Sequence, residues 1–132
     1  MKMNAIVAGV GMTRFGKMLD TGLKGIGGEA VNAAIKDAGI QPGDIQAAYV
    51  GNAAAGLVTG QECIRGQVVL RSVGIGKIPV VNVENACASA STALIQPSAM
   101  VTPGLSDVGL LYTSEAADCR NCVVLRCPSL IS

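Results

Sequence analysis

Short apolar runs alternate with longer segments of helical periodicity along this chain, and this alternation constrains the fold more than any other feature. In the longer segments, apolar residues recur every three or four positions, which is typical of amphipathic helices. Gly and Pro residues mark the boundaries between segments. The predicted strands cover 5–10, 47–51, 80–83 and 107–112, and the predicted helices cover 21–38, 61–73 and a segment that begins near Cys87.

This order, βαβαβαβ, predicts an α/β domain with a mostly parallel sheet flanked by helices. The predicted strands are continuously apolar, as expected for strands that are buried on both faces. Thr21 is the expected N-cap of the first helix and Gly39 its C-terminal stop. A chain of 132 residues without internal repeats or linkers fits one domain with its own core.

The composition excludes several classes of partner. A net charge of +1 and 14% charged residues leave no basic stripe, so we expect no nucleic-acid partner. No stretch reaches the roughly 20 apolar residues of a membrane span, so we expect no membrane partner. Five Cys residues without a secretory signal favour thiols in a reducing compartment and predict a cytoplasmic protein. The chain contains no His, which excludes an imidazole base or a His metal ligand from its own residues.

The segment that ends the third predicted strand contains the best candidate for chemistry. After the strand 80–83, a short turn leads to Cys87 at the start of a predicted helix, followed by the small residues 88–91. Unpaired N–H groups and the positive end of the helix dipole favour a thiolate at such a position. Like a nucleophile elbow, this is a sharp turn from a strand to a helix, but it lacks the glycines of that motif. From the residues alone, a buried structural cysteine remains the alternative.

A second cysteine cluster lies near the end of the chain. Cys119 and Cys122 form a CxxC pair, with Cys127 further on. Such a pair is half of a typical zinc site, but a structural site needs four ligands and the second pair is missing. A thioredoxin-like redox pair is also disfavoured, because the pair does not follow a βαβ unit in the expected way. We therefore predict no metal site.

Several segments together resemble the thiolase family in colinear order, from residue 4 to about residue 116. The opening segment is similar to the branch that contains sterol carrier protein X and the lipid-transfer proteins. Ser114-Glu115 resembles part of the family's Gly-Ser-Glu signature. The segments that carry the resemblance are 10–17 (VGMTRFGK), 60–62 (GQE), 73–79 (VGIGKIP), 83–89 (VENACAS) and 107–110 (DVGL).

The resemblance implies a partial thiolase-like half in which Cys87 matches the family's nucleophile. Such a cysteine attacks an acyl-CoA thioester and holds the acyl group covalently. A second thioester or free coenzyme A then completes a Claisen condensation or its reverse, thiolysis. The expected substrates are coenzyme A thioesters, with no bound cofactor. The helix N–H groups near Cys87 would face the developing oxyanion.

The sequence also departs from the family. Thiolases are several times longer and consist of two similar halves, with the catalytic His and a second acid–base Cys in the second half. This sequence has no His, so we expect the chain to be inactive alone, which leaves open whether it is an enzyme. Pro97 and Pro103 are expected to interrupt the helix that follows Cys87.

These departures lead to a division of the chain and to alternative functions. Residues 1–116 form an incomplete thiolase-like domain, and 117–132 form a tail unlike the family, either out of frame or disordered. The alternatives are a non-catalytic thiolase-like interaction or structural module and a lipid-transfer-protein-type subunit. An exposed edge at 80–83 and an apolar surface left uncovered by the missing half predict a homo-oligomer or pairing with a fuller thiolase chain.

Overall fold

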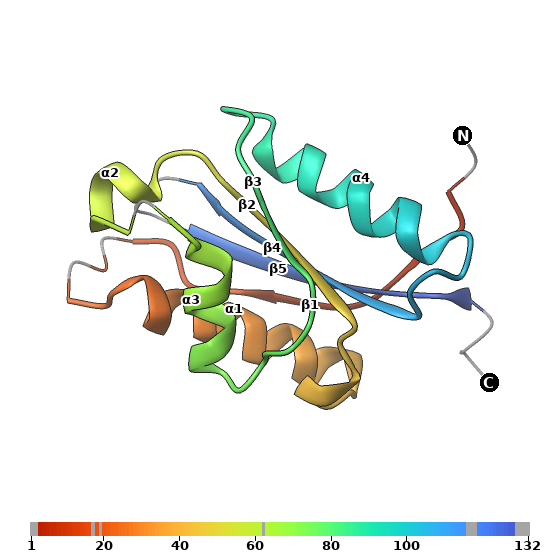
Figure 1. Cartoon of the computed structure of the whole chain (residues 1–132). Helices are drawn as coiled ribbons and strands as arrows, with labels where there is room; N and C mark the ends of the chain where they lie inside the picture. The colour runs from red at the N-terminus through yellow and green to blue at the C-terminus, as the bar shows by residue number, and fades with distance from the viewer. Residues whose placement is uncertain (1–2, 17, 19, 62, 116–118, 129–132) are drawn as a thin grey trace.

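The computed structural model describes residues 3–16, 18, 20–61, 63–115 and 119–128, and shows a sheet with helices on both faces (Figure 1). Helices α1 and α3 lie on one face and α4 on the other. The elements are β1 (Ile6–Met12), α1 (Leu23–Ala38), a 3₁₀ turn (Pro42–Asp44), β2 (Ala47–Asn52), α2 (Ala55–Thr59), α3 (Arg65–Ser72), β3 (Val80–Val83), α4 (Ser89–Val101), β4 (Val108–Glu115) and β5 (Cys119–Arg126).

The sheet has five strands in the order β1-β5-β4-β2-β3. Strand β2 is parallel to β3 and β4, whereas β5 is antiparallel to both β1 and β4. Four strands therefore run in one direction and β5 runs against them. The predicted α/β class, with a mostly parallel sheet flanked by helices, is confirmed.

Strand β5 was not expected from the sequence. It lies in the segment 117–132 that we set apart as a tail, of which 117, 118 and 129–132 are outside the described residues. Its residues Cys122, Val124 and Leu125 are buried. The run of apolar residues from 122 to 125 is a strand signal, which the interpretation of this segment as a tail unlike the family left out of account. The strand fills the position between β1 and β4.

Helix α1 packs very closely on β1 because β1 contains two glycines. A Cβ atom on Gly9 or Gly11 would collide with the backbone of α1. The N-cap of this helix is Gly22 rather than Thr21, one residue later than predicted. Gly39 ends it in the left-handed region with φ 66°, as the sequence predicted. Among the described residues, no helix is long and apolar enough to cross a membrane.

Helix α4 corrects one expectation. We expected Pro97 to interrupt this helix, but the helix continues through it and ends at Val101, ahead of Pro103. Pro97 is fully buried, and a Cβ atom on Gly109 of β4 would lie 3.1 Å from its ring. Tight packing on the sheet offsets the hydrogen bond that the proline cannot donate.

Candidate functional site

The carboxyl ends of β2 and β3 lie at the same end of the sheet because these strands are parallel. From β2 the chain passes to α2 and α3, and from β3 it passes to α4 on the opposite face. Such a divergence is a topological switch point, the usual ligand site of open α/β sheets. Figure 1 shows the turn from β3 to α4 and the short helix α2 at this end of the sheet.

Cys87 lies in that turn and is exposed. It precedes the N-cap residue Ala88, so the prediction of a helix that opens near Cys87 is confirmed, with the cysteine just ahead of the first turn. The alternative of a buried structural cysteine is wrong. The preceding residue, Ala86, has φ 44°, a left-handed conformation that is costly for any residue with a Cβ atom.

Side-chain hydrogen bonds hold this turn on both sides of Ala86. The hydroxyl of Ser89 accepts a hydrogen bond from the Asn85 amide at 2.8 Å and donates one to the Ala86 carbonyl at 2.8 Å. The amide of Asn85's side chain donates to Thr92 Oγ1 at 3.0 Å. The Ala88 amide donates to the Asn85 carbonyl at 2.9 Å. The turn that presents Cys87 is therefore bonded to the first turn of α4.

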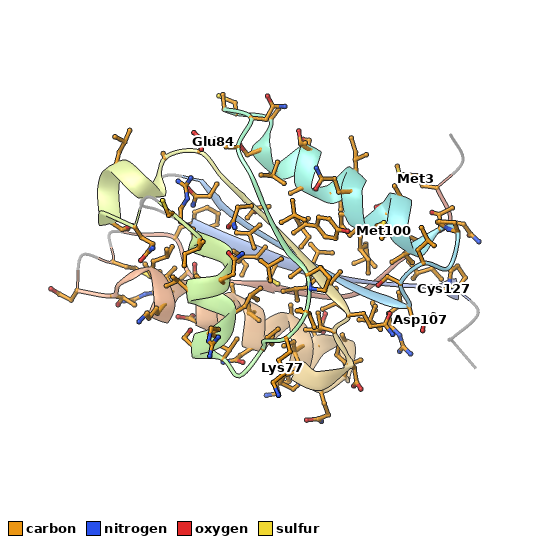
Figure 2. The ribbon with its side chains drawn as sticks, in the orientation of Figure 1. Met3, Lys77, Glu84, Met100, Asp107 and Cys127 are labelled. Carbon is orange, nitrogen blue, oxygen red and sulfur yellow. The ribbon has the colours of Figure 1, made fainter. Side chains whose placement is uncertain are left out.

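A second polar cluster ties the ends of β2 and β3 together. Arg65, the first residue of α3, donates through Nη1 to Asn52 Oδ1 at 3.2 Å, at the end of β2. Its Nη2 pairs with Glu84 Oε2 at 3.2 Å, directly after β3. Figure 2 shows Glu84 beside the turn that leads into α4. Because Glu84 is 65% exposed, the pair contributes little to stability. Together with the Asn52 bond it links the start of α3 to the ends of β2 and β3.

Sequence reasoning missed this cluster. The available signal was the placement of Asn52 and Glu84, each directly after a predicted parallel strand. Polar residues at those positions meet at one edge of the sheet. The partner, Arg65, is identified only once α3 is placed on the sheet.

Three other cysteines have described side chains, and they differ in burial. Cys63 falls within the predicted helix 61–73, but it is exposed in the segment before α3. Cys122 is buried in β5, and this burial raises the pKa of its thiol. Cys127 is half-buried beyond the end of β5. Within the described part of the chain, no group of three His, Cys, Asp or Glu side chains could hold a metal ion.

A pocket of about 500 Å³ lies at the opposite end of the sheet, where β2 and β4 begin, away from Cys87. Asp44, Gln46, Val108 and Arg126 are among its lining residues. Figure 2 shows Asp107, the neighbour of Val108, at the end of the sheet opposite Glu84. The pocket is open and holds no cysteine, so it is separate from the candidate nucleophile.

Comparisons with known proteins agree with this geometry. Residues 5–117 match the family model described as thiolase, N-terminal domain. The chain is 41% identical over 105 residues to acetyl-CoA acetyltransferase of Methanocaldococcus jannaschii, covering 80% of this chain and 26% of that protein. It is 35% identical over 117 residues to sterol carrier protein 2 of Gallus gallus, covering 87% of this chain and 20% of that protein.

Solved structures share the fold. Acetyl-CoA acetyltransferase from Syntrophomonas wolfei matches with a TM-score of 0.72 at 24% identity, over 84% of this chain and 29% of that one. OleA of Xanthomonas campestris matches with a TM-score of 0.81 at 11% identity, over 97% of this chain and 59% of that one. The chain spans about a quarter of the acetyltransferase of M. jannaschii, and the family match ends before β5. The chain belongs to the thiolase family, and its residues 5–117 correspond to the family's N-terminal domain.

Proposed function

We propose that this chain carries the acyl-accepting part of a thiolase-family acyltransferase, with Cys87 as the nucleophile. The observation that carries the proposal is the exposure of Cys87 in a sharp turn at the carboxyl ends of β2 and β3. A nucleophile in such a turn is accessible to a substrate while its backbone is held by the sheet and the helix. Membership of the thiolase family supports an acyl-CoA thioester as the substrate.

The proposed step exchanges one thioester for another. The Cys87 thiol loses its proton to water, and its Sγ attacks the carbonyl carbon of the acyl-CoA thioester. A new carbon–sulfur bond forms to Cys87, the bond to coenzyme A breaks, and the coenzyme A thiolate takes up a proton. The acyl group then passes to free coenzyme A in thiolysis, or to the carbanion of a second thioester in Claisen condensation. No bound cofactor takes part in either route.

The full cycle needs groups that these 132 residues do not supply. The chain has no His, so no imidazole of its own can accept the thiol proton or activate the second substrate. We therefore expect the chain alone to accept an acyl group slowly and not to turn over. Groups from another polypeptide or a longer form of the chain would complete the site.

Strand β3 supports association as part of this function. It lies at the edge of the sheet, as expected from the sequence, and its Val81 is 40% exposed. An exposed apolar edge strand favours pairing with another chain. The partner that we propose is a second copy of this chain or a fuller thiolase chain. The proposed location is the cytoplasm.

A non-catalytic interaction module is the second candidate function. The observation that favours it is the set of exposed apolar side chains outside the turn, which include Val10 at 56%, Met12 at 55% and Ile95 at 52%. Apolar surface of this kind marks contact sites between proteins. A lipid-transfer-type subunit belongs to the same class, because it too would act without an acyl-cysteine.

Acetyl-CoA distinguishes the two candidates. We expect incubation with acetyl-CoA, followed by peptide mapping under conditions that preserve thioesters, to find an acetyl group on Cys87. Cys63 is a matched internal control because it is also exposed but lies outside the turn, so it should stay unmodified. Acetylation of neither thiol, or of both equally, would favour the interaction module.

A further inference from the structure

Ser89 stands out among the residues around Cys87 because its buried hydroxyl is not used by the helix to which it belongs. Only 1% of Ser89 is exposed, yet its hydroxyl bonds backwards, to the Asn85 amide and the Ala86 carbonyl. The N-cap position of α4 is Ala88, which has no side-chain cap. The hydroxyl therefore serves the turn before the helix.

The two bonds of this hydroxyl bracket the one left-handed alanine of the turn. Ala86, with φ 44°, lies between Asn85, whose amide donates to the hydroxyl, and Cys87. A non-glycine residue keeps such a conformation only where the surrounding structure holds it. By accepting from the Asn85 amide and donating to the Ala86 carbonyl, Ser89 holds the chain on both sides of this strained residue, which directly precedes Cys87.

The backbone of Ser89 is itself fixed to the sheet. A Cβ atom on Gly51 of β2 would lie 2.7 Å from the Ser89 carbonyl oxygen, so the start of α4 rests directly on the backbone of β2. Ser89 thus joins three parts of the site: the strand below, the helix that it begins and the turn that carries Cys87. Loss of its hydroxyl would leave the helix in place and remove only the two side-chain hydrogen bonds from Ser89 to the turn.

We propose that Ser89 is a positioning residue for Cys87, whose hydroxyl holds the Asn85–Cys87 turn in the conformation that aims the thiol at a bound thioester. This role rests on the proposed function of Cys87. It predicts that the hydroxyl matters for transfer from a substrate that must be aligned, and much less for reaction with a small reagent that needs no alignment.

The test compares two reactions of Cys87 in the wild type, in Ser89→Ala and in a matched control. Ser98→Ala is the control because Ser98 is also buried on α4 and donates its hydroxyl to a backbone carbonyl, that of Leu94 at 2.8 Å. The first reaction is acetyl transfer from acetyl-CoA, and the second is alkylation by iodoacetamide. Peptide mapping also follows Cys122, a buried thiol that is alkylated only when the fold opens.

We expect Ser89→Ala to slow acetyl transfer to Cys87 by at least about tenfold while its alkylation rate stays close to that of the wild type. Cys122 should stay protected, and Ser98→Ala should match the wild type in both reactions. Ser89→Thr, which keeps a hydroxyl, should recover part of the lost transfer. Hydrogen exchange at the Asn85 amide should become faster only in Ser89→Ala.

Other outcomes separate the failure of this role from the failure of the proposed function. A wild type that takes no acetyl group would overturn the proposed function, and the role of Ser89 with it. An acetylated wild type with an equally fast Ser89→Ala, or with both reactions altered alike, would overturn the role of Ser89 alone. If Ser89→Ala exposes Cys122 to alkylation, Ser89→Thr provides the test instead. A folded Ser89→Thr protein with wild-type hydrogen exchange at the Asn85 amide but no acetyl transfer to Cys87 would contradict the role of Ser89.

Discussion

The two faces of the sheet are covered to different extents. The face under α1 and α3 carries the larger core, in which Val31, Leu70, Leu110 and Tyr112 are almost completely buried. The face under α4 carries a smaller cluster built around Tyr49, Ala93 and Leu111. Val10 of β1 pairs with Val123 on this second face and is 56% exposed.

Because of this difference, the face that supplies most of the stability is not the face whose helix leads from the Cys87 turn. Buried apolar area, the main source of stability, is concentrated under α1 and α3. The face of α4, whose turn carries Cys87, is only partly covered. Substitutions on the first face should therefore change the free energy of unfolding, and substitutions on the second should change reactivity or association.

The largest expected effect on the free energy of unfolding comes from a comparison of two leucines, one on each face of the sheet. Leu70 of α3 is 1% exposed, and Leu70→Ala should lower the free energy of unfolding by about 2–5 kcal/mol, because it leaves a cavity. Leu94 of α4 is 40% exposed, and Leu94→Ala should cost below about 1 kcal/mol. Urea unfolding measures both. Equal losses would contradict the unequal division of the core.

An intermediate effect depends on pH through Cys122, which packs on the face of α1. Burial raises the pKa of this thiol above its ordinary value of 9.0. Below pH 9 both folded and unfolded thiols are protonated, so Cys122 adds no pH dependence. Above it the unfolded thiol ionises first, and stability should fall by about 1.4 kcal/mol per pH unit.

Urea unfolding between pH 8 and pH 10, under reducing conditions, checks this expectation. Cys122→Ala should lose the extra slope, whereas Cys63→Ala, which removes an exposed thiol, should keep it. The same slope in all three proteins would show that burial on this face does not control the titration.

The smallest effect on stability, with a separate effect on association, is expected on the partly covered face. Val10→Lys combined with Met12→Lys should change the free energy of unfolding by at most about 0.5 kcal/mol, because both side chains are more than half exposed. Charges on this edge strand should reduce self-association, measured by sedimentation. Leu57→Lys, at a 93% exposed position on α2, is the control and should leave association unchanged.

Local patterns in the sequence were enough to predict most of the fold. Helical spacing predicted α1, and apolar runs predicted β2, β3 and β4, because the burial of those segments is visible in their own composition. Strand β5 was missed because the segment 117–132 is unlike the thiolase family and was therefore interpreted as a tail outside the domain. Helix α2 was missed because the Gly- and Ala-rich segment 52–60 has no amphipathic period.

The site was predictable only in part. Cys87 followed from its place after a strand and from the resemblance to the thiolases, and the structure places it at a switch point. The contacts of Arg65 with Asn52 and Glu84 join residues from three separate segments, so no local pattern predicts them. The hydrogen bonds of Ser89 depend on the left-handed conformation of Ala86, which the sequence does not indicate.

Transfer of an acetyl group to a single thiol tests the central claim most directly. Wild-type protein and Cys87→Ser would be treated in parallel with acetyl-CoA, and their intact masses measured. The account predicts one added acetyl group on the wild type and none on Cys87→Ser. Equal modification of the two proteins, or none of either, would contradict the assignment of Cys87 as the acyl-accepting nucleophile.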